Sequence, residues 1–381
     1  MTKHLAVIAL AAAAMAACEQ NRGVTDPAAA AVETSLQARH AEELGDGRDG
    51  PRAIYTLTNQ VAGNSVAVFT RAADGTLSAA GRVATGGTGT GAGLGSQGAV
   101  ALSDDGRWLF AVNAGSNDVS VFAVRPSGLS LAGRTASGGT RPISLTIHRN
   151  VLYVLNAGGD GNISGFTVSA SGDLTPISGA IRSLSATNVG PAQVAFSPDG
   201  RRLVVTEKTT NLLDVYAVNQ NGAAGEGTSV ASAGVTPFGF AFGHRNELFV
   251  SEASGSASSY LLGRRGGLRT VSGAVLTHQG APCWLVVTDD GRYTYTANAQ
   301  GASISGFTIA RNGAIHLLDA DGATAVVGRG TSDLALSANG RYLYNLVGGS
   351  VFAFRVQEDG HLAPLGTVTG LPGGTVGLAA R

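Results

Sequence analysis

Short apolar runs separated by turns that contain glycine recur along almost the whole chain. The clearest copy spans residues 282–309, where an apolar run leads to Asp290-Gly291, then to an alternating run, then to a third run that ends at Phe307. Asp-Gly between two strand-like runs favours a tight hairpin, because the turn needs a positive φ that glycine adopts without a steric penalty. The unit is therefore predicted to be an antiparallel meander.

The unit repeats every 43 to 49 residues, which is close to the roughly 40–50 residues of a propeller blade. The copies start at Gln97, Pro142, Pro191, Pro237, Pro282 and Thr331, with a last partial copy near Gly374. A second, outer turn occurs seven times, at Asp74-Gly75, Ser127-Gly128, Ser171-Gly172, Asn221-Gly222, Gly266-Gly267, Asn312-Gly313 and Asp359-Gly360. Seven outer turns predict seven blades.

The two ends of the repeat region are complementary. The first copy lacks an inner strand and begins with its second one, at residues 54–58, whereas the chain ends with a lone apolar run at residues 375–380. We therefore predict an all-β fold, a seven-bladed β-propeller of four-stranded antiparallel blades, in which the C-terminal strand completes the first blade. Such closure leaves no free sheet edge between the first and last blades.

Residues 1–18 have the layout of an export signal, with Lys3, an apolar stretch and small residues before Cys18. The sequence Met15-Ala16-Ala17-Cys18 resembles a bacterial lipobox and predicts that Cys18 is lipidated. The alternative is cleavage by ordinary signal peptidase, which would give a soluble exported protein. Residues 19–50 are interpreted as a flexible tether and residues 51–381 as the propeller. The expected location is the bacterial cell envelope, facing the periplasm or the exterior, with the lipid anchor as the one membrane contact.

Composition and motifs exclude several classes of function. The 26 Lys and Arg residues equal the 26 Asp and Glu residues, so no basic footprint for nucleic acid is present. The chain contains no H-E-x-x-H, no G-x-S-x-G and no paired-cysteine spacing, and we expect neither a metal site nor a cofactor. The glycine-rich run at residues 86–98 lacks the phosphate-loop pattern and leads into a strand, which indicates a flexible loop.

In a meander blade, the start of the first strand and the end of the second meet at one face of the ring. At that face two neighbouring blades carry Glu207 and Glu252, where three other blades carry Asn113, Asn156 and Asn298 and one carries Val347. Converging carboxylates can share a proton and act as catalytic groups, with His278 in a nearby loop as a possible general base. The alternatives are solvated carboxylates on a polar rim and an ordinary loop histidine.

Five further residues at the same face are candidate ligand contacts: Arg141, Gln193, Phe238, Trp284 and Asp333. Trp284 could stack on a ring-shaped ligand or pack between blades. Arg141, like Arg329, could bind an anion or remain a solvated loop residue.

The blades resemble those of the lactonase-type seven-bladed propellers, which include 6-phosphogluconolactonases and carboxymuconate cycloisomerases. The resemblance is carried by phrases such as FSPDGRRLVVTEKTTNLLDVYAV and FAVNAGSNDVSVFAV and covers about residues 52–381. The chain is also similar to propellers named for a Tyr-Val-Thr-Asn repeat, as in Tyr153-Val154-Leu155-Asn156. The resemblance implies the propeller fold and, if the chain is an enzyme, lactone hydrolysis or cycloisomerisation.

Members of the family with lactone chemistry place a His, two Arg and a Glu at the channel mouth. In this chain the His position is Ala192, the Arg positions are Phe238 and Ala299, and the Glu position is Glu252. With one of four retained, the resemblance favours binding of a small organic or sugar-like ligand, or of an envelope protein, over the family's lactone chemistry. The alternative is a diverged lactone hydrolase or cycloisomerase that uses Glu252 and Glu207.

Overall fold

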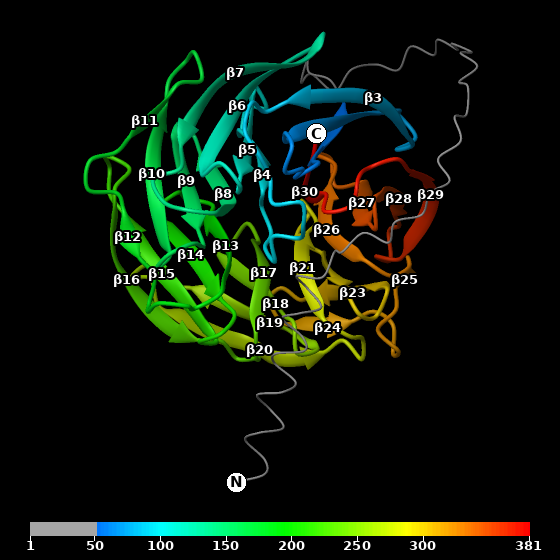
Figure 1. The fold of residues 1–381 in the computed structure, drawn as a ribbon. Coiled ribbons are helices and arrows are strands. Elements are labelled where there is room, and N and C mark those ends of the chain that lie inside the picture. Colours follow the sequence, from blue (N-terminus) through cyan, green and yellow to red (C-terminus); the bar gives the residue numbers. More distant parts are fainter. Residues whose placement is uncertain (1–51) are drawn as a thin grey trace, which may run out of the picture.

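The protein is described by a computed structural model that covers residues 52–381. These residues form a ring of seven antiparallel sheets around a central axis (Figure 1). The seven blades and the four-stranded pattern confirm the architecture predicted from the turns. The predicted export signal (1–18), the lipidation site Cys18 and the tether (19–50) lie outside the described residues.

We number the blades 1 to 7 along the chain and give their strands from the axis outwards. Blade 1 contains β30 (Val376–Ala380), β1 (Ala53–Leu57), β2 (Ser65–Arg71) and β3 (Leu77–Ala84). Blade 2 contains β4 (Val100–Leu102), β5 (Trp108–Asn113), β6 (Asp118–Arg125) and β7 (Gly128–Ala136). Blade 3 contains β8 (Pro142–His148), β9 (Val151–Asn156), β10 (Asn162–Val168) and an outer strand split into β11 (Leu174–Pro176) and β12 (Arg182–Ser183).

The remaining blades follow the same order. Blade 4 contains β13 (Pro191–Phe196), β14 (Arg202–Glu207), β15 (Leu212–Val218) and β16 (Ala224–Ala231). Blade 5 contains β17 (Pro237–Phe242), β18 (Glu247–Glu252), β19 (Ser256–Leu262) and β20 (Leu268–Leu276). Blade 6 contains β21 (Pro282–Val287), β22 (Tyr293–Asn298), β23 (Ser303–Ile309) and the split outer strand β24 (Ile315–Leu317) and β25 (Ala325–Val326). Blade 7 contains β26 (Thr331–Leu336), β27 (Tyr342–Val347), β28 (Ser350–Val356) and β29 (Leu362–Val368).

The ring is closed by the C-terminal strand, as predicted. Strand β30 pairs antiparallel with β1, in a register that places Thr56 opposite Leu378. The Thr56 hydroxyl also donates a hydrogen bond of 2.6 Å to the Gly377 carbonyl. Blade 1 therefore combines the two ends of the propeller in one sheet, which removes an unpaired edge.

Local turn chemistry explains why the hairpins form where they do. In blade 6, Gly291 has a φ of 66°, and the Asp290 carboxylate accepts hydrogen bonds from the Arg292 amide at 3.0 Å and the Thr288 hydroxyl at 2.6 Å. Such side-chain bonds to the turn backbone favour the tight reversal over a longer loop.

The core lies between neighbouring blades. Three tyrosines on second strands, in blades 3, 6 and 7, are fully buried and reach the outer turn of the next blade. The Tyr153 hydroxyl donates to the Gly222 carbonyl, Tyr295 to Gly360 and Tyr344 to Gly75, at 2.8, 2.8 and 3.1 Å. Burial of apolar side chains thus holds neighbouring blades together, and the buried tyrosine hydroxyls fix the position of one blade relative to the next.

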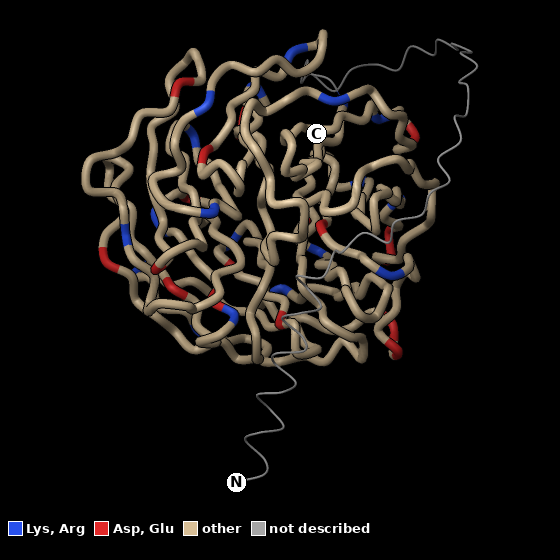
Figure 2. Tube along the Cα trace, viewed as in Figure 1, with Lys and Arg blue, Asp and Glu red and all other residues tan. Residues whose placement is uncertain are grey.

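We call the face where the first strands begin and the second strands end the upper face. The strand register pairs Pro191 with Glu207 in blade 4 and Pro237 with Glu252 in blade 5. The start of the first strand thus meets the end of the second strand in each blade, as predicted. Figure 2 shows basic and acidic residues interspersed around the ring rather than gathered by sign. Among residues 52–381, no helix has the length and hydrophobicity that would let it cross a bilayer.

Candidate functional site

The glycine-rich segment closes the mouth of the central channel on the upper face. It runs from β3 of blade 1 to β4 of blade 2 and reaches the inner strands on other sides of the ring (Figure 1). The Ser96 hydroxyl donates to the Ile143 carbonyl in blade 3 at 2.8 Å, and the Gln97 amide donates to the Ala192 carbonyl in blade 4 at 3.1 Å. The prediction of a flexible loop is therefore wrong, because its far end is fixed to distant blades by hydrogen bonds.

The aromatic candidates lie directly beneath this segment. Phe238 and Trp284 are buried, and their rings meet edge to face at 5.2 Å between centroids. The Trp284 indole donates to the Ser96 carbonyl at 2.9 Å. The Lys208 ammonium lies 5.1 Å from the Phe238 ring centroid and donates to the Gly95 carbonyl at 2.6 Å. In this arrangement both aromatic rings contact the protein itself, and their role as ligand contacts stays a prediction.

The side chains of Gln193 and Asp333 form hydrogen bonds to the backbone of neighbouring inner strands. The Gln193 amide exchanges two hydrogen bonds with the backbone of Phe240, at 2.9 and 2.7 Å. The Asp333 carboxylate accepts a 3.0 Å hydrogen bond from the Gly377 amide. Burial raises the pKa of Asp333 to about 7, although the backbone donors act in the opposite direction.

The two candidate catalytic carboxylates are fully buried, so their interpretation as solvated rim residues is wrong. Glu207 accepts a 3.0 Å hydrogen bond from the Ser185 amide, and Glu252 accepts one of 3.0 Å from the Gly234 amide. Both donors lie in the linkers that enter blades 4 and 5. Burial raises the pKa of Glu252, and hydroxyl and amide donors offset part of that effect. A catalytic role for either carboxylate stays a prediction.

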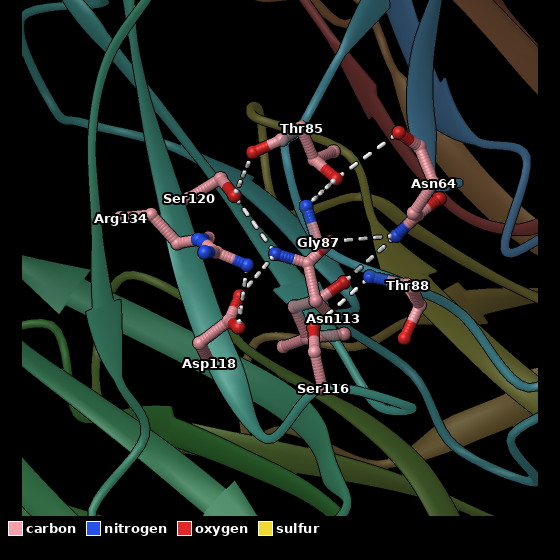
Figure 3. Close-up of polar contacts among 10 residues, drawn as sticks. Asn64, Thr85, Gly87, Thr88, Asn113, Ser116, Asp118, Ser120 and Arg134 are labelled. Atoms are coloured by element: carbon pink, nitrogen blue, oxygen red, sulfur yellow. Dashed lines mark hydrogen bonds and ion pairs between the residues drawn. The ribbon is translucent and has the colours of Figure 1, made fainter. Parts of the chain in front are cut away.

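Asparagines hold the linkers in blades 2 and 3. Figure 3 shows the arrangement in blade 2, where Asn113 donates to Asp118 at 2.6 Å and to Ser120 at 2.8 Å. The Ser120 hydroxyl in turn donates to the Thr85 carbonyl of the linker at 2.9 Å. Glu207 and Glu252 thus occupy a position whose shared task is to hold the preceding linker.

Glu207 has a carboxyl neighbour that the sequence analysis missed. Asp214 on β15 lies opposite Val205, on the same face of the sheet as Glu207, and burial, followed by a hydrogen bond with Glu207, raises the pKa of Asp214 to about 7. Comparison of the repeats could have found it, since Asp214 stands where blades 2 and 3 carry Ser120 and Ser164. His278, in contrast, is exposed on the linker between blades 5 and 6, with a φ of 56°.

A cavity of about 200 Å³ opens on the upper face between blades 3 and 4, beside the closed channel mouth. Its wall includes Arg141, Leu94, Lys208 and the linker residues 188–190. Arg141 has a φ of 52°, and its amide donates to the Asn117 side chain at 2.7 Å, which fixes the backbone from which the guanidinium extends. Of the predicted site residues, Arg141 is the one that lines this cavity.

The turn after β9 also lines the cavity, and the Ala157 amide at its start donates to the Arg141 carbonyl at 2.9 Å. It contributes Asp160 between two glycines, Gly159 and Gly161, which both have positive φ. Neither Glu207 nor Glu252 lines the cavity. Residues 52–381 contain no cluster of three or more His, Cys, Asp and Glu side chains placed to hold a metal ion. The cavity wall therefore carries the Arg141 and Lys208 side chains, the Asp160 carboxylate, backbone groups and an apolar surface that includes Leu94.

Residues 49–191 match a family model described as lactonase, 7-bladed beta-propeller. A search of curated proteins gives no match. Among solved structures, a candidate 6-phosphogluconolactonase from Bacteroides fragilis superposes with a TM-score of 0.71 at 18% identity, covering 88% of this chain and 99% of the other. A protein from Lactobacillus plantarum gives 0.71 at 16% identity, covering 86% and 98%. The periplasmic gluconolactonase PpgL of Pseudomonas aeruginosa gives 0.69 at 20% identity, covering 85% and 98%. At these identities the superpositions show a shared fold.

Proposed function

We propose that this lactonase-family seven-bladed β-propeller binds a small anionic organic ligand, of the size of a sugar acid, in the cavity between blades 3 and 4. The observation that carries the proposal is the position of Arg141 in the wall of a cavity of about 200 Å³ at the upper face. A guanidinium recognises a carboxylate through two parallel hydrogen bonds, and the hydroxyls of a sugar-like ligand suit the backbone groups of the surrounding turns.

Binding is favoured over lactone chemistry because the acid and base groups do not reach the cavity. A general base must lie within hydrogen-bond distance of the proton that it removes. Glu207 and Glu252 are instead held by the Ser185 and Gly234 amides in the linkers. The position at which the family carries an arginine is Phe238, which packs on Trp284.

The second candidate is a diverged lactone hydrolase or cycloisomerase with Glu252 as its base and Glu207 as its acid or orienting partner. It is supported by the fold shared with the gluconolactonase PpgL and by the burial of Glu252, which raises the pKa of its carboxyl group above the usual value. This mechanism requires the linkers to move away from both carboxylates.

Calorimetric titration with gluconate separates the two proposals. Wild type should bind gluconate, and Arg141→Ala should weaken binding by about tenfold or more, the loss expected for one charge-assisted contact. Arg329→Ala is the matched control, since Arg329 is an exposed arginine in the linker that enters blade 7 and should leave affinity unchanged. Equal affinity in wild type and Arg141→Ala would overturn the binding site. Turnover of gluconolactone that disappears in Glu252→Gln would establish the enzyme instead.

For location, we propose export and lipid anchoring through Cys18 in a bacterial envelope. The support is the sequence from Lys3 to Cys18 and the periplasmic location stated for PpgL. An envelope protein is the alternative partner, and no nucleic acid or cofactor is proposed. Metabolic labelling with a fatty acid should mark the wild type and leave Cys18→Ser unlabelled. A labelled Cys18→Ser variant would contradict this anchor.

A further inference from the structure

Blades 2 and 3 hold their preceding linkers with neutral side chains. In blade 3 the Asn156 amide donates to the Ser164 hydroxyl at 3.3 Å, and the Ser164 hydroxyl donates to the Ser137 carbonyl of the linker. The corresponding pair in blade 2 is Asn113 and Ser120 (Figure 3). Neither pair changes charge at any ordinary pH, so these linkers are held by contacts that do not titrate.

Blade 4 has two acids at the same positions. Glu207 accepts hydrogen bonds from the Ser185 hydroxyl at 2.5 Å and from the Thr210 hydroxyl at 2.6 Å. Asp214 accepts one at its Oδ1 from the Ser229 hydroxyl at 2.6 Å. The buried Asp214 Oδ2 has no donor among the described residues. Asp214 lies opposite Val205 on the neighbouring strand, diagonal to Glu207 on the same face of the sheet, where blade 2 has its hydrogen-bonded pair Asn113 and Ser120. Two carboxyl groups in contact form a hydrogen bond only when one of them carries a proton.

The other titratable and charged groups near Glu207 and Asp214 already have partners of their own. Tyr216, on the same strand, approaches Asp214, and its hydroxyl donates to the Ser183 carbonyl at 3.2 Å. Glu226 on β16 pairs with Arg182 on β12 at 3.5 Å, so this arginine already faces an acid. Lys208 follows Glu207 in the chain, and its ammonium extends to the Gly95 carbonyl and the Phe238 ring. Burial and the neighbouring Glu207 raise the pKa of Asp214 to about 7, which places loss of the shared proton near neutral pH.

The linker held by this pair forms part of the cavity. It spans residues 184–190 between β12 and β13, and Leu184, Asn188, Val189 and Gly190 all line the cavity between blades 3 and 4. Ser185, which donates both its amide and its hydroxyl to Glu207, lies next to Leu184 in that linker. Any displacement of Glu207 therefore moves the wall of the cavity.

We propose that Glu207 and Asp214 share one proton, and that its loss to solvent releases the linker at residues 184–190 and loosens the cavity wall. Below neutral pH the shared proton joins the two carboxyl groups and the wall is closed. Above neutral pH both carry a negative charge, repel each other, and Glu207 withdraws from Ser185. The link to ligand binding rests on the proposed function, whereas the movement of the linker does not.

Hydrogen exchange of the full chain between pH 5.5 and 8.5, corrected for the intrinsic rate, tests this device. The protection of residues 184–190 should fall by about tenfold or more across this range, because exchange reports the free energy of local opening. The linker at residues 137–141, held by Asn156 and Ser164, is the internal control and should keep its protection. An equal response of the two linkers would overturn the proposal.

The double variant Glu207→Asn with Asp214→Ser gives blade 4 the neutral pair of blade 3. It should abolish the pH dependence of residues 184–190 and leave the rest of the exchange pattern unchanged. If that variant fails to fold, Asp214→Asn keeps the shape of the site, removes the shared proton and should have the same effect. Retained pH dependence in a folded variant sinks the proposal. A linker that responds to pH in a protein that binds no gluconate at any pH would support the switch and refute the proposed function.

Discussion

Gln97 and Leu285 belong to blades 2 and 6, yet they exchange two hydrogen bonds across the centre of the ring. The Gln97 side-chain amide donates to the Leu285 carbonyl at 2.8 Å, and the Leu285 amide donates to Gln97 Oε1 at 2.8 Å. The Gln97 side chain, at the end of the glycine-rich segment, therefore pairs with the backbone N–H and C=O of Leu285 as a neighbouring strand would. These hydrogen bonds fix the segment that closes the channel to an inner strand.

Replacement of Gln97 by alanine should destabilise the propeller by roughly 2–4 kcal/mol, because two buried backbone groups of Leu285 lose their partners. Urea unfolding of wild type and Gln97→Ala measures the difference. The exposed Gln357 provides the control, and Gln357→Ala should stay within about 0.5 kcal/mol of wild type. Equal losses in the two variants would mean that the cross-ring contact is not what stabilises the mouth.

Removal of residues 376–381 should open the ring. The deletion exposes the edge of β1 and removes the buried Val376 and Leu378, whose side chains alone contribute about 3 kcal/mol. An unpaired edge also promotes association between molecules. We expect a lower Tm and aggregates in size-exclusion chromatography, whereas Arg381→Ala, which keeps β30, should elute at the volume of the wild type. A truncated chain as stable as wild type would show that closure by β30 is dispensable.

His361 connects blades 6 and 7 and should make their contact dependent on pH. Its Nε2 lies 3.3 Å from the Asp319 carboxylate and its Nδ1 lies 3.1 Å from that of Asp359. Partial burial opposes the shift, but hydrogen bonds to Asp359 and Asp319 raise the pKa of His361 above its usual value. The stabilisation is therefore present below about pH 6.5 and is lost as pH rises through the higher pKa of the folded protein.

An NMR titration of the imidazole signals checks that sign. Asp319→Asn should lower the pKa of His361 towards the ordinary histidine value, because one of the two carboxylates is neutralised. Asp321→Asn changes a nearby exposed acid that bonds to the Ala323 amide, and it should leave the histidine titration unchanged. A titration that Asp319→Asn does not alter would exclude Asp319 as the cause.

The blades could be predicted from the sequence because their information is local. Asp290-Gly291 and its counterparts specify turns within a few residues, and alternating runs such as residues 293–298 specify strands on either side. The same holds for closure, since the missing inner strand of the first copy and the lone run at the end are both visible in the sequence.

The site was less predictable because its contacts are distant and involve backbone atoms. The carbonyls of Gly95 and Ser96 are the acceptors that bind Lys208 and Trp284, and no side-chain pattern marks a carbonyl as a partner. Burial of Glu207 was hidden for a different reason. A carboxylate at a strand end suggests a solvated residue on the rim. That interpretation changes only when the equivalent residues Asn113 and Asn156 are known to be buried and to hold the preceding linkers through hydrogen bonds.

Asp333 should give the propeller a loss of stability between acidic and neutral pH. Asp333 is 3% exposed, and burial raises the pKa of its carboxyl group to about 7, although the Gly377 amide acts in the opposite direction. Because the folded pKa lies above the unfolded value of about 4, the contribution is fully present below pH 4 and is lost as pH rises to 7. The linkage amounts to roughly 3–4 kcal/mol at most.

The isosteric change Asp333→Asn isolates this effect, because an amide oxygen still accepts from the Gly377 amide but does not titrate. Urea unfolding at pH 5 and pH 8 should show that wild type loses more stability than Asp333→Asn, while the contribution of Asp214 cancels between them. Asp105→Asn is the control, since Ser103 and Arg107 hold the pKa of Asp105 below its usual value despite partial burial, and its effect should be equal at both pH values. If wild type and Asp333→Asn lose stability in parallel, the buried carboxyl at the closure of the ring does not titrate in this range.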